Sequence, residues 1–377
     1  MIHFSRQIAL GFYYKLLLAV GMKSTDFKNR KIIIDMEKIL TIVIPTYNMQ
    51  DYLRRCLDSL IVPEEQMQLL EVLVVNDGSK DNSSAIAHEY QDKYPDTFRV
   101  IDKENGNYGS CVNRGLKEAT GKYIKILDAD DWFDNQMFHT FLDKLSQLDY
   151  DLILTDYQVV NEKGKVTGMP ILTMSPFKEH CFEDMFTILE NEVKMHNVTY
   201  KRDKLIDISY RQTEGISYTD QEWITWPMVA IDSIYYINIV LYQYMLGREG
   251  QTMSLESMRK SFSHIAKVVL SLGDIWNTYQ GQNIRKQFLK NKFVKLLKVV
   301  YRSGIENKIY DEDDLLQFDL MLKSKNQNIY YDLNNVLISK IVRIPYIKLW
   351  RRNKTHLLAY FFMLNRLVVK IYIRFLK

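Results

Sequence analysis

Cysteine is scarce in this chain of 377 residues, and its three copies, Cys56, Cys111 and Cys181, are widely scattered. This odd set predicts neither a disulfide framework nor the ligand spacing of a zinc site. The chain also lacks a Gly-x-Gly-x-x-Gly fingerprint and a phosphate-binding P-loop, which disfavours the dinucleotide-binding and ATPase classes. It has no internal repeat, and 47% of its residues are hydrophobic, so we expect a globular intracellular enzyme with a large core.

Acidic side chains are absent after Asp332, whereas basic residues recur there among apolar and aromatic ones. These basic residues are Lys340, Arg343, Lys348, Arg351, Arg352, Lys354, Arg366, Lys370, Arg374 and Lys377. The pattern predicts a basic amphipathic tail over residues 333–377, a kind of helix that lies in the interface of anionic membranes. The alternative is that the tail packs against the body of the protein with a solvated cationic face. The apolar run from Leu357 to Leu364 is too short to span a bilayer.

The leader, residues 1–37, contains an apolar and aromatic run from Ile8 to Met22 that Lys15 interrupts. No small-residue cleavage site follows this run, which disfavours export. Met36 immediately precedes the first expected strand. Two alternatives therefore stay open: translation begins at Met36, or the leader is an interfacial helix.

The pattern after residue 38 alternates between short β-branched runs and helix-like spacing. Residues 40–44 and 71–75 read as strands, and residues 51–60 between them have helical spacing. A helix over 81–94 and strands over 99–101 and 123–127 continue the alternation. These elements predict an α/β fold with a mostly parallel sheet flanked by helices.

An acidic triplet, Asp128-Ala129-Asp130, follows the last of these strands, and Asp131 comes next. The carboxyl edge of an open α/β sheet is where such folds place their ligands. Carboxylate oxygens there suit Mg²⁺ or Mn²⁺ carrying a diphosphate. The triplet alone is weak evidence, because Asp-x-Asp also occurs in surface turns and helix caps.

Four motifs occur in a fixed order along this region. They are Pro45-Thr46-Tyr47-Asn48, Asn76-Asp77-Gly78-Ser79, Asn113 with Gly115 and Gly121, and Asp128-Ala129-Asp130-Asp131. Together they resemble the signature of family 2 glycosyltransferases of the GT-A (Rossmann-like) fold, of the bacterial surface-polysaccharide type. The resemblance covers residues 38–250. It implies a nucleotide-diphosphate sugar donor, a divalent cation (Mn²⁺ or Mg²⁺) and inversion at the anomeric carbon.

The resemblance assigns a nucleotide-binding role to residues of all four motifs. Pro45, Thr46 and Tyr47 match the loop that walls the base and ribose, and Asp77 matches the residue that accepts the N–H of uracil. The alternative for Asp77 is a turn-forming residue before Gly78.

In the same way, Asp128 would contact ribose or metal, and Asp130 would coordinate the metal that bridges both phosphates. Asp131 is either a further ligand contact or the N-cap of the next helix. Asn113 is the nucleotide-binding candidate of the third motif. Many relatives have Arg before this asparagine, but Val112 stands there, so a phosphate contact by Arg114 on its other side is not expected.

Inversion requires a base that takes the proton of the acceptor hydroxyl. The segment Ser217-Tyr-Thr-Asp-Gln-Glu-Trp223 lies where the family carries this residue, with Asp220 at the base position and Thr219 in place of the usual Glu. Glu222 is the competitor. Either carboxylate could instead cap the helix that follows.

Two further residues are candidates for donor or acceptor contacts. His196 lies where relatives carry a segment lining the sugar and acceptor pocket, although a lone His is more often structural. Arg248, between Gly247 and Gly250, resembles a mobile loop that grips the donor diphosphate. Its alternative is a solvated turn.

The sequence thus predicts a leader at 1–37, a GT-A catalytic domain at 38–252, a helical region at 253–332 and the tail at 333–377. In the helical region, Ile265, Val268 and Leu272 share one face.

The expected function is a metal-dependent inverting hexosyl- or N-acetylhexosaminyltransferase. It would use a UDP-sugar and a glycan or lipid-linked acceptor, peripheral to the inner face of the plasma membrane. Nucleic acid is not an expected partner, because the catalytic half has no basic stripe comparable to the tail. Two alternatives remain: a sugar-phosphate nucleotidyltransferase, which normally begins with a glycine-rich basic loop, and a catalytically silent scaffold of a polysaccharide assembly complex.

Overall fold

A computed structural model describes residues 37–248, 261–353 and 355–375 of the chain. The alternatives for the leader fall on residues 1–36, which lie outside the described residues, as does Gly250. None of the helices in the described ranges is long and apolar enough to cross a membrane.

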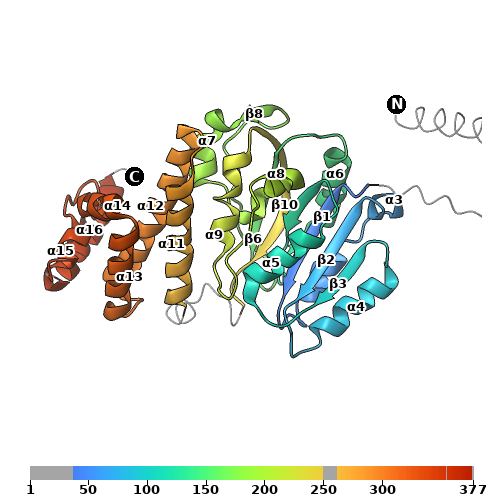
Figure 1. The fold of residues 1–377 in the computed structure, drawn as a ribbon, viewed down its shortest axis with the longest axis horizontal. Coiled ribbons are helices and arrows are strands. Elements are labelled where there is room, and N and C mark those ends of the chain that lie inside the picture. Colours follow the sequence, from blue (N-terminus) through green and yellow to red (C-terminus); the bar gives the residue numbers. More distant parts are fainter. Residues whose placement is uncertain (1–36, 249–260, 354, 376–377) are drawn as a thin grey trace, which may run out of the picture. The chain divides into compact units, whose positions relative to one another are not determined.

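Ten strands form one sheet within the described residues, in the order β3-β2-β1-β4-β9-β6-β10-β5, with β7 paired to β6 and β8 to β10 (Figure 1). The strands are β1 (Leu40–Thr46), β2 (Leu70–Asn76), β3 (Phe98–Asp102), β4 (Tyr123–Ile126), β5 (Trp132–Phe133), β6 (Leu152–Val160), β7 (Val166–Gly168), β8 (Glu179–Cys181), β9 (Val198–Lys201) and β10 (Ser233–Met245). β1 pairs in parallel with β2 and β4, and β6 pairs in parallel with β10. β9 is antiparallel to both β4 and β6, so these two strands run in the same direction. The predicted α/β fold with a mostly parallel sheet is confirmed.

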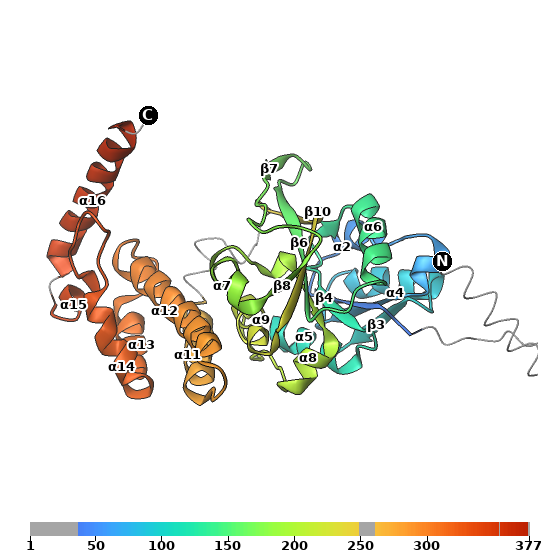
Figure 2. The same cartoon turned by 90° about the horizontal axis from the view of Figure 1, so that it is seen from above.

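Helices cover both faces of this sheet, because alternate strand residues point to opposite sides. On one face, Leu40, Ile42 and Ile44 of β1 pack with apolar residues of α2, α4 and α6. On the other face, Val43 packs with residues of α5, α7, α8 and α9. Figure 2 shows α5 and α8 on the opposite side of the sheet from α2 and α6. The helices of this part are α2 (Leu53–Asp58), α3 (Glu64–Met67), α4 (Ser83–Lys93), α5 (Asn107–Glu118), α6 (Asn135–Leu145), α7 (Phe182–Asn191), α8 (Arg202–Asp207) and α9 (Asp220–Trp223), with 3-10 turns η2 (Met195–Asn197) and η3 (Pro227–Ala230).

Gly115 lets α5 approach the sheet closely. A Cβ at this position would lie 2.3 Å from Cγ1 of Val43, which is far inside van der Waals contact. Gly115 of the third motif is therefore required by the close packing of α5 on β1.

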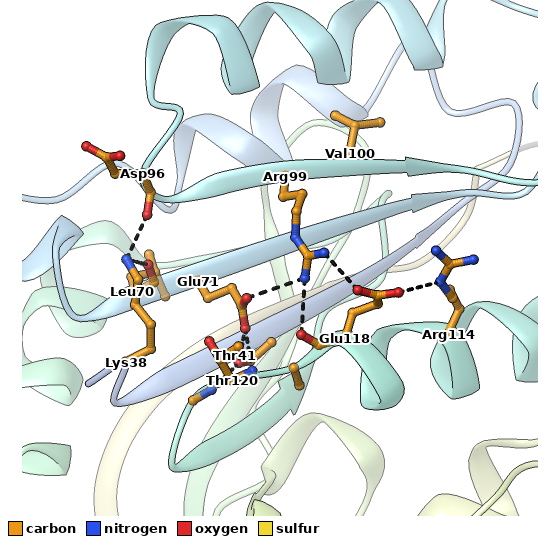
Figure 3. Close-up of polar contacts among 12 residues, drawn as sticks. Lys38, Thr41, Leu70, Glu71, Asp96, Arg99, Val100, Arg114, Glu118 and Thr120 are labelled. Atoms are coloured by element: carbon orange, nitrogen blue, oxygen red, sulfur yellow. Dashed lines mark hydrogen bonds and ion pairs between the residues drawn. The ribbon is translucent and has the colours of Figure 1, made fainter. Parts of the chain in front are cut away.

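An ionic network ties the C-terminal end of α5 to the sheet (Figure 3). Arg99 on β3 pairs with Glu118 at 2.9 Å and with Glu71 at 3.6 Å, and Glu71 accepts a 2.6 Å hydrogen bond from the Thr41 hydroxyl. Arg114 pairs with Glu118 at 3.0 Å. The network therefore holds Arg114 beside Glu118, on the C-terminal half of α5.

The C-terminal helices form a third core. They are α11 (Phe262–Thr278), α12 (Asn283–Ile305), α13 (Glu312–Lys325), α14 (Gln327–Asp332), η4 (Leu333–Asn335), α15 (Tyr346–Trp350) and α16 (Thr355–Phe375). The first part of the tail contributes Ile338, Tyr346 and Trp350 to this core. Arg351 is not part of a solvated cationic face, because its guanidinium pairs with buried Asp319 at 2.6 Å.

Candidate active site

The carboxyl ends of β1, β2 and β4 meet around one cleft of about 460 Å³. They meet because β1 lies between β2 and β4, with which it pairs in parallel. Predicted residues from four separate segments line the cleft, namely Pro45, Thr46, Tyr47, Asp77, Asp128, Asp130 and Arg248. The sequence did not single out Asn105, Tyr108 or Tyr244, which also line it.

Asp77 lies at one end of the cleft and is 3% exposed. Its Oδ1 accepts hydrogen bonds from Nζ of Lys103 and from the backbone N–H of Gly106, the latter at 2.9 Å. Its own backbone N–H donates to the carbonyl of Thr46 at 2.8 Å, which joins the first two motifs. Gly78 has a φ of 72°, so the turn expected after this strand is present.

The cleft adjoins a second hollow of about 590 Å³, which shares Tyr47 and Asn105 with it. Lys80 and Lys103 also line this hollow. Sequence reasoning missed Lys103, although a lysine directly after β3 was the available signal.

The acidic loop after β4 brings together carboxylate oxygens of Asp128, Asp130 and Asp131, all within 4.8 Å of one another. Oδ1 of Asp128 accepts a hydrogen bond from the Tyr108 hydroxyl at 2.7 Å. Burial, and then the charge of Asp130, raise the pKa of Asp128 to about 7. A carboxylate whose pKa is raised by a neighbouring carboxylate belongs to a site that favours a cation.

Asp131 links the acidic loop to β10. Its Oδ1 accepts from the backbone N–H of Met245 and its Oδ2 from the Tyr242 hydroxyl, each at 2.7 Å. The N-cap alternative for Asp131 was wrong, because Asp134 caps α6 by accepting from the N–H of Met137 at 3.0 Å. With both oxygens held by β10, Asp131 positions the loop, and the structure gives no support to a donor or acceptor contact.

Arg248 lies next to the acidic loop. Its Nε donates to Oδ2 of Asp130 at 2.6 Å, and both side chains are about seven-eighths buried. Its guanidinium also lies over the ring of Tyr52, 5.5 Å from the centroid. A solvated turn is therefore the wrong description of Arg248.

Asp220 is the first residue of α9 and remains partly exposed. Its Oδ2 accepts a 2.9 Å hydrogen bond from Nε2 of Gln221, while its partial burial raises its pKa above the usual range. Asp220 itself does not line the cleft, although Ser217 of the same segment does. The charge of Asp220 contributes to the raised pKa of Asp128. A carboxylate with a raised pKa is a stronger base than an ordinary Asp.

Glu222, the competitor of Asp220, is buried and fully engaged. Its two oxygens accept from the backbone N–H and the hydroxyl of Thr213, both at 2.7 Å. Glu222 thus fixes the segment that precedes α9, and it is 1% exposed. Of the two carboxylates, Asp220 is the one accessible to a substrate.

Asn113 has a different role from the expected nucleotide contact. Its Nδ2 donates to the carbonyl of Gln212 at 2.9 Å, and its Oδ1 accepts from the N–H of Gln212 at 2.8 Å. Nδ2 also donates to Glu214. The amide therefore joins α5 to the segment before Asp220, and Asn113 does not line the cleft.

His196 is enclosed by aromatic rings and does not line the cleft. The ring centroids of Tyr157, Tyr242 and Tyr244 lie 4.8, 4.6 and 4.3 Å from that of His196. Burial, and then the charge of Lys125, lower its pKa to about 3. His196 is a neutral packing residue that supports Tyr244, which does line the cleft. The prediction that His196 itself contacts the donor or acceptor was therefore wrong.

Comparison with known families gives the site its context. The family described as Glycosyl transferase family 2 matches residues 41–205, which span the first, second, third and fourth motifs. The chain carries a family 2 glycosyltransferase domain.

Curated relatives of this glycosyltransferase domain come from several bacteria. The chain is 32% identical over 152 residues to "Glycosyltransferase GlyA" of Streptococcus pneumoniae, a match over 40% of this chain and 21% of that protein. It is 29% identical over 228 residues to "Uncharacterized glycosyltransferase YibD" of Escherichia coli, covering 55% of this chain and 61% of that protein. The chain therefore spans about a fifth of the length of the first relative and about three fifths of the second.

Solved structures show the same fold for this glycosyltransferase domain and part of the C-terminal helices. TarS of S. aureus, residues 1–349, in complex with UDP-GlcNAc, has a TM-score of 0.64 at 18% identity, covering 87% of this chain and 91% of that one. The predicted GT-A fold with a helical C-terminal extension is confirmed.

Proposed function

We propose that this chain is an inverting, metal-dependent glycosyltransferase that moves a hexosyl or N-acetylhexosaminyl group from a UDP-sugar to an acceptor hydroxyl. One observation carries the proposal: Asp77, the Asp128–Asp130 pair and Arg248 line a single cleft, which Ser217 of the segment that carries Asp220 also lines. Asp77 matches the base of a nucleotide-sugar, and Asp128, Asp130 and Arg248 match its diphosphate. Asp220 matches the hydroxyl of the acceptor.

Asp77 supports the uridine assignment. Its Oδ1 accepts from Lys103 and Gly106, and we assign the imide N–H of uracil to Oδ2. A hydrogen bond to a buried carboxylate discriminates strongly between bases, because a base lacking that donor leaves this oxygen without it. The UDP-GlcNAc complex of TarS, a protein of the same fold, is consistent with this donor class.

Asp128 and Asp130 fit a divalent cation, Mn²⁺ or Mg²⁺. Their oxygens are the hard ligands that these ions prefer, whereas the oxygens of neighbouring Asp131 are taken by β10. When bound, the cation supplies Lewis-acid stabilisation of the charge on the departing diphosphate. Arg248, held beside Asp130 at 2.6 Å, adds a second positive charge that can contact the same phosphates.

Asp220 takes the proton of the acceptor hydroxyl. Its raised pKa brings it nearer to the operating pH, and its partial exposure leaves it accessible. Inversion follows when this base acts on the face of the sugar opposite the diphosphate. The buried, fully bonded Glu222 holds the segment that positions Asp220.

The exposed face of α16 supports a peripheral place on the inner face of the plasma membrane. Its apolar side chains recur at helical spacing and are 38–63% exposed, at Leu357, Tyr360, Met363, Leu364 and Leu367. Leu358 and Phe362, on the opposite face, pack into the third core. One face of α16 thus packs on the protein, and the proposal assigns the other face to the membrane. A membrane-bound enzyme is suited to a lipid-linked acceptor in cell-surface polysaccharide synthesis.

The decisive experiment measures the melting temperature of the full chain with nucleotide diphosphates and sugar nucleotides, with and without Mn²⁺. A ligand that binds the native state raises this temperature. We expect a metal-dependent rise with UDP or a UDP-sugar, its loss in Asp130→Ala, and its retention in Asp220→Asn together with loss of turnover. The absence of a rise with every nucleotide in a folded sample would contradict the proposal and favour a silent scaffold.

A further inference from the structure

Lys292 on α12 is a buried cation without a carboxylate partner. The residue is 5% exposed, and no carboxylate in the described part of the chain forms an ion pair with its ammonium. The ring of Phe288 lies 5.7 Å from its Nζ. Burial without a carboxylate partner disfavours the charged form of a lysine, and an anionic ligand would stabilise that form.

Two more lysines lie around Lys292. Lys295, one turn further along α12, donates from Nζ to Oδ1 of Asn191 at 3.1 Å. Asn191 ends α7, and Lys194 follows three residues later as the residue before η2. Lys292 and Lys295 share one face of α12, because they are three residues apart on this helix. Burial, and then the charges of Lys194 and Lys295, lower the pKa of Lys292 to about 7.

The acidic residues near this lysine cluster, Glu190 and Asp220, do not neutralise it. Glu190 accepts a 2.9 Å hydrogen bond from Asn291, and neither carboxylate pairs with a lysine of the cluster. Asp220 is nevertheless close, because η2 packs against α9 and the charge of Lys194 acts on the pKa of Asp220. None of the three lysines lines the donor cleft. The cluster therefore lies beside the base and outside the nucleotide site.

We propose that Lys194, Lys292 and Lys295 bind a phosphate ester of the acceptor and hold the acceptor hydroxyl next to Asp220. The inference rests on the proposed glycosyl transfer and adds the chemical class of the acceptor. Three ammonium groups from two segments offer several donors and up to three positive charges, which suits a tetrahedral dianion better than a single carboxylate. An anion there would also compensate the buried charge of Lys292.

The test measures the melting temperature of the full chain with saturating UDP and Mg²⁺, so that the donor site is occupied, while glycerol 1-phosphate is added. Sodium chloride at matched ionic strength is the reference. We expect a saturable rise of about 2 °C in the wild type. Lys292→Met should abolish it, and Lys295→Met should weaken it several-fold. Lys323→Met, on an exposed position of α13, should leave it unchanged.

An equal rise in Lys292→Met and the wild type would overturn the site. A rise with methyl glucuronide and none with glycerol 1-phosphate would overturn the phosphate class. The UDP-dependent rise, measured first without glycerol 1-phosphate, separates the two proposals. Its absence contradicts the glycosyltransferase proposal, whereas its presence without any response to glycerol 1-phosphate contradicts the acceptor site alone.

Discussion

Replacing His196 by Phe should make the stability of this protein less sensitive to acid. His196 is buried among three tyrosine rings, and its Nδ1 has no hydrogen-bond partner in the described part of the chain. Its pKa falls from the ordinary 6.5 to about 3 in the folded protein. The unfolded chain therefore takes up a proton below pH 6.5 that the folded protein refuses, and stability is lost as the pH falls from 6.5 towards 3.

The magnitude follows from these two pKa values. At pH 7 the unfolded His196 is mostly neutral and the cost is only about 0.2 kcal/mol. At pH 5 the unfolded residue is almost fully protonated, and the cost rises to about 2 kcal/mol. Phe fills the same aromatic enclosure without a titrating group. The variant should therefore gain about 2 kcal/mol relative to the wild type between pH 7 and pH 5.

The assay is urea unfolding of both proteins at pH 7 and pH 5, followed by tryptophan fluorescence. Other titrating groups cancel when the difference between variant and wild type is compared at the two values of pH. His139→Gln, at an exposed position, is the control and should show no comparable change. UDP binding should persist in His196→Phe, since His196 does not line the cleft. A difference that stays constant between pH 7 and pH 5 would refute the reasoning.

Two other substitutions test packing and membrane contact. Gly115→Ala should reduce the free energy of unfolding by about 1–3 kcal/mol, because the new Cβ would meet Val43 at 2.3 Å; an unchanged urea midpoint would show that α5 shifts freely. The double variant Tyr360→Ser and Met363→Ser should lose co-sedimentation with vesicles containing phosphatidylglycerol, while Leu316→Ser on α13 should retain it. Equal binding by the wild type, the double variant and Leu316→Ser would argue against the exposed face of α16 as the membrane contact.

The parts of the fold and site that the sequence predicts are those that local patterns determine. The β-branched runs of β1 and β2 and the acidic loop after β4 carry their own signals, and parallel pairing brings their ends together. The order of the later strands was not readable, because β9 inserts between β4 and β6 through long-range pairing.

The roles of individual polar residues depend on partners far along the chain. The sequence around Asp131 suggested a helix cap. In the structure its oxygens accept from Tyr242 and Met245, more than 100 residues later. Asn113 likewise has its partner at Gln212. Lys292 carries no motif, and its significance arises only from burial against the catalytic domain. Sequence reasoning therefore finds residues that end strands more readily than residues whose role is set by a distant neighbour.

The hydrogen bonds of Asp131 fix the acidic loop and the end of β10 relative to one another. Asp130 and Arg248 stand on these two segments, so any exchange of the 233–248 segment for that of a relative also moves the group that faces Asp130. Chimeras built to alter donor preference should accordingly transplant residues 128–131 and 233–248 as one unit. A graft of either segment alone would separate two halves of a site that the chain assembles through a single buried carboxylate.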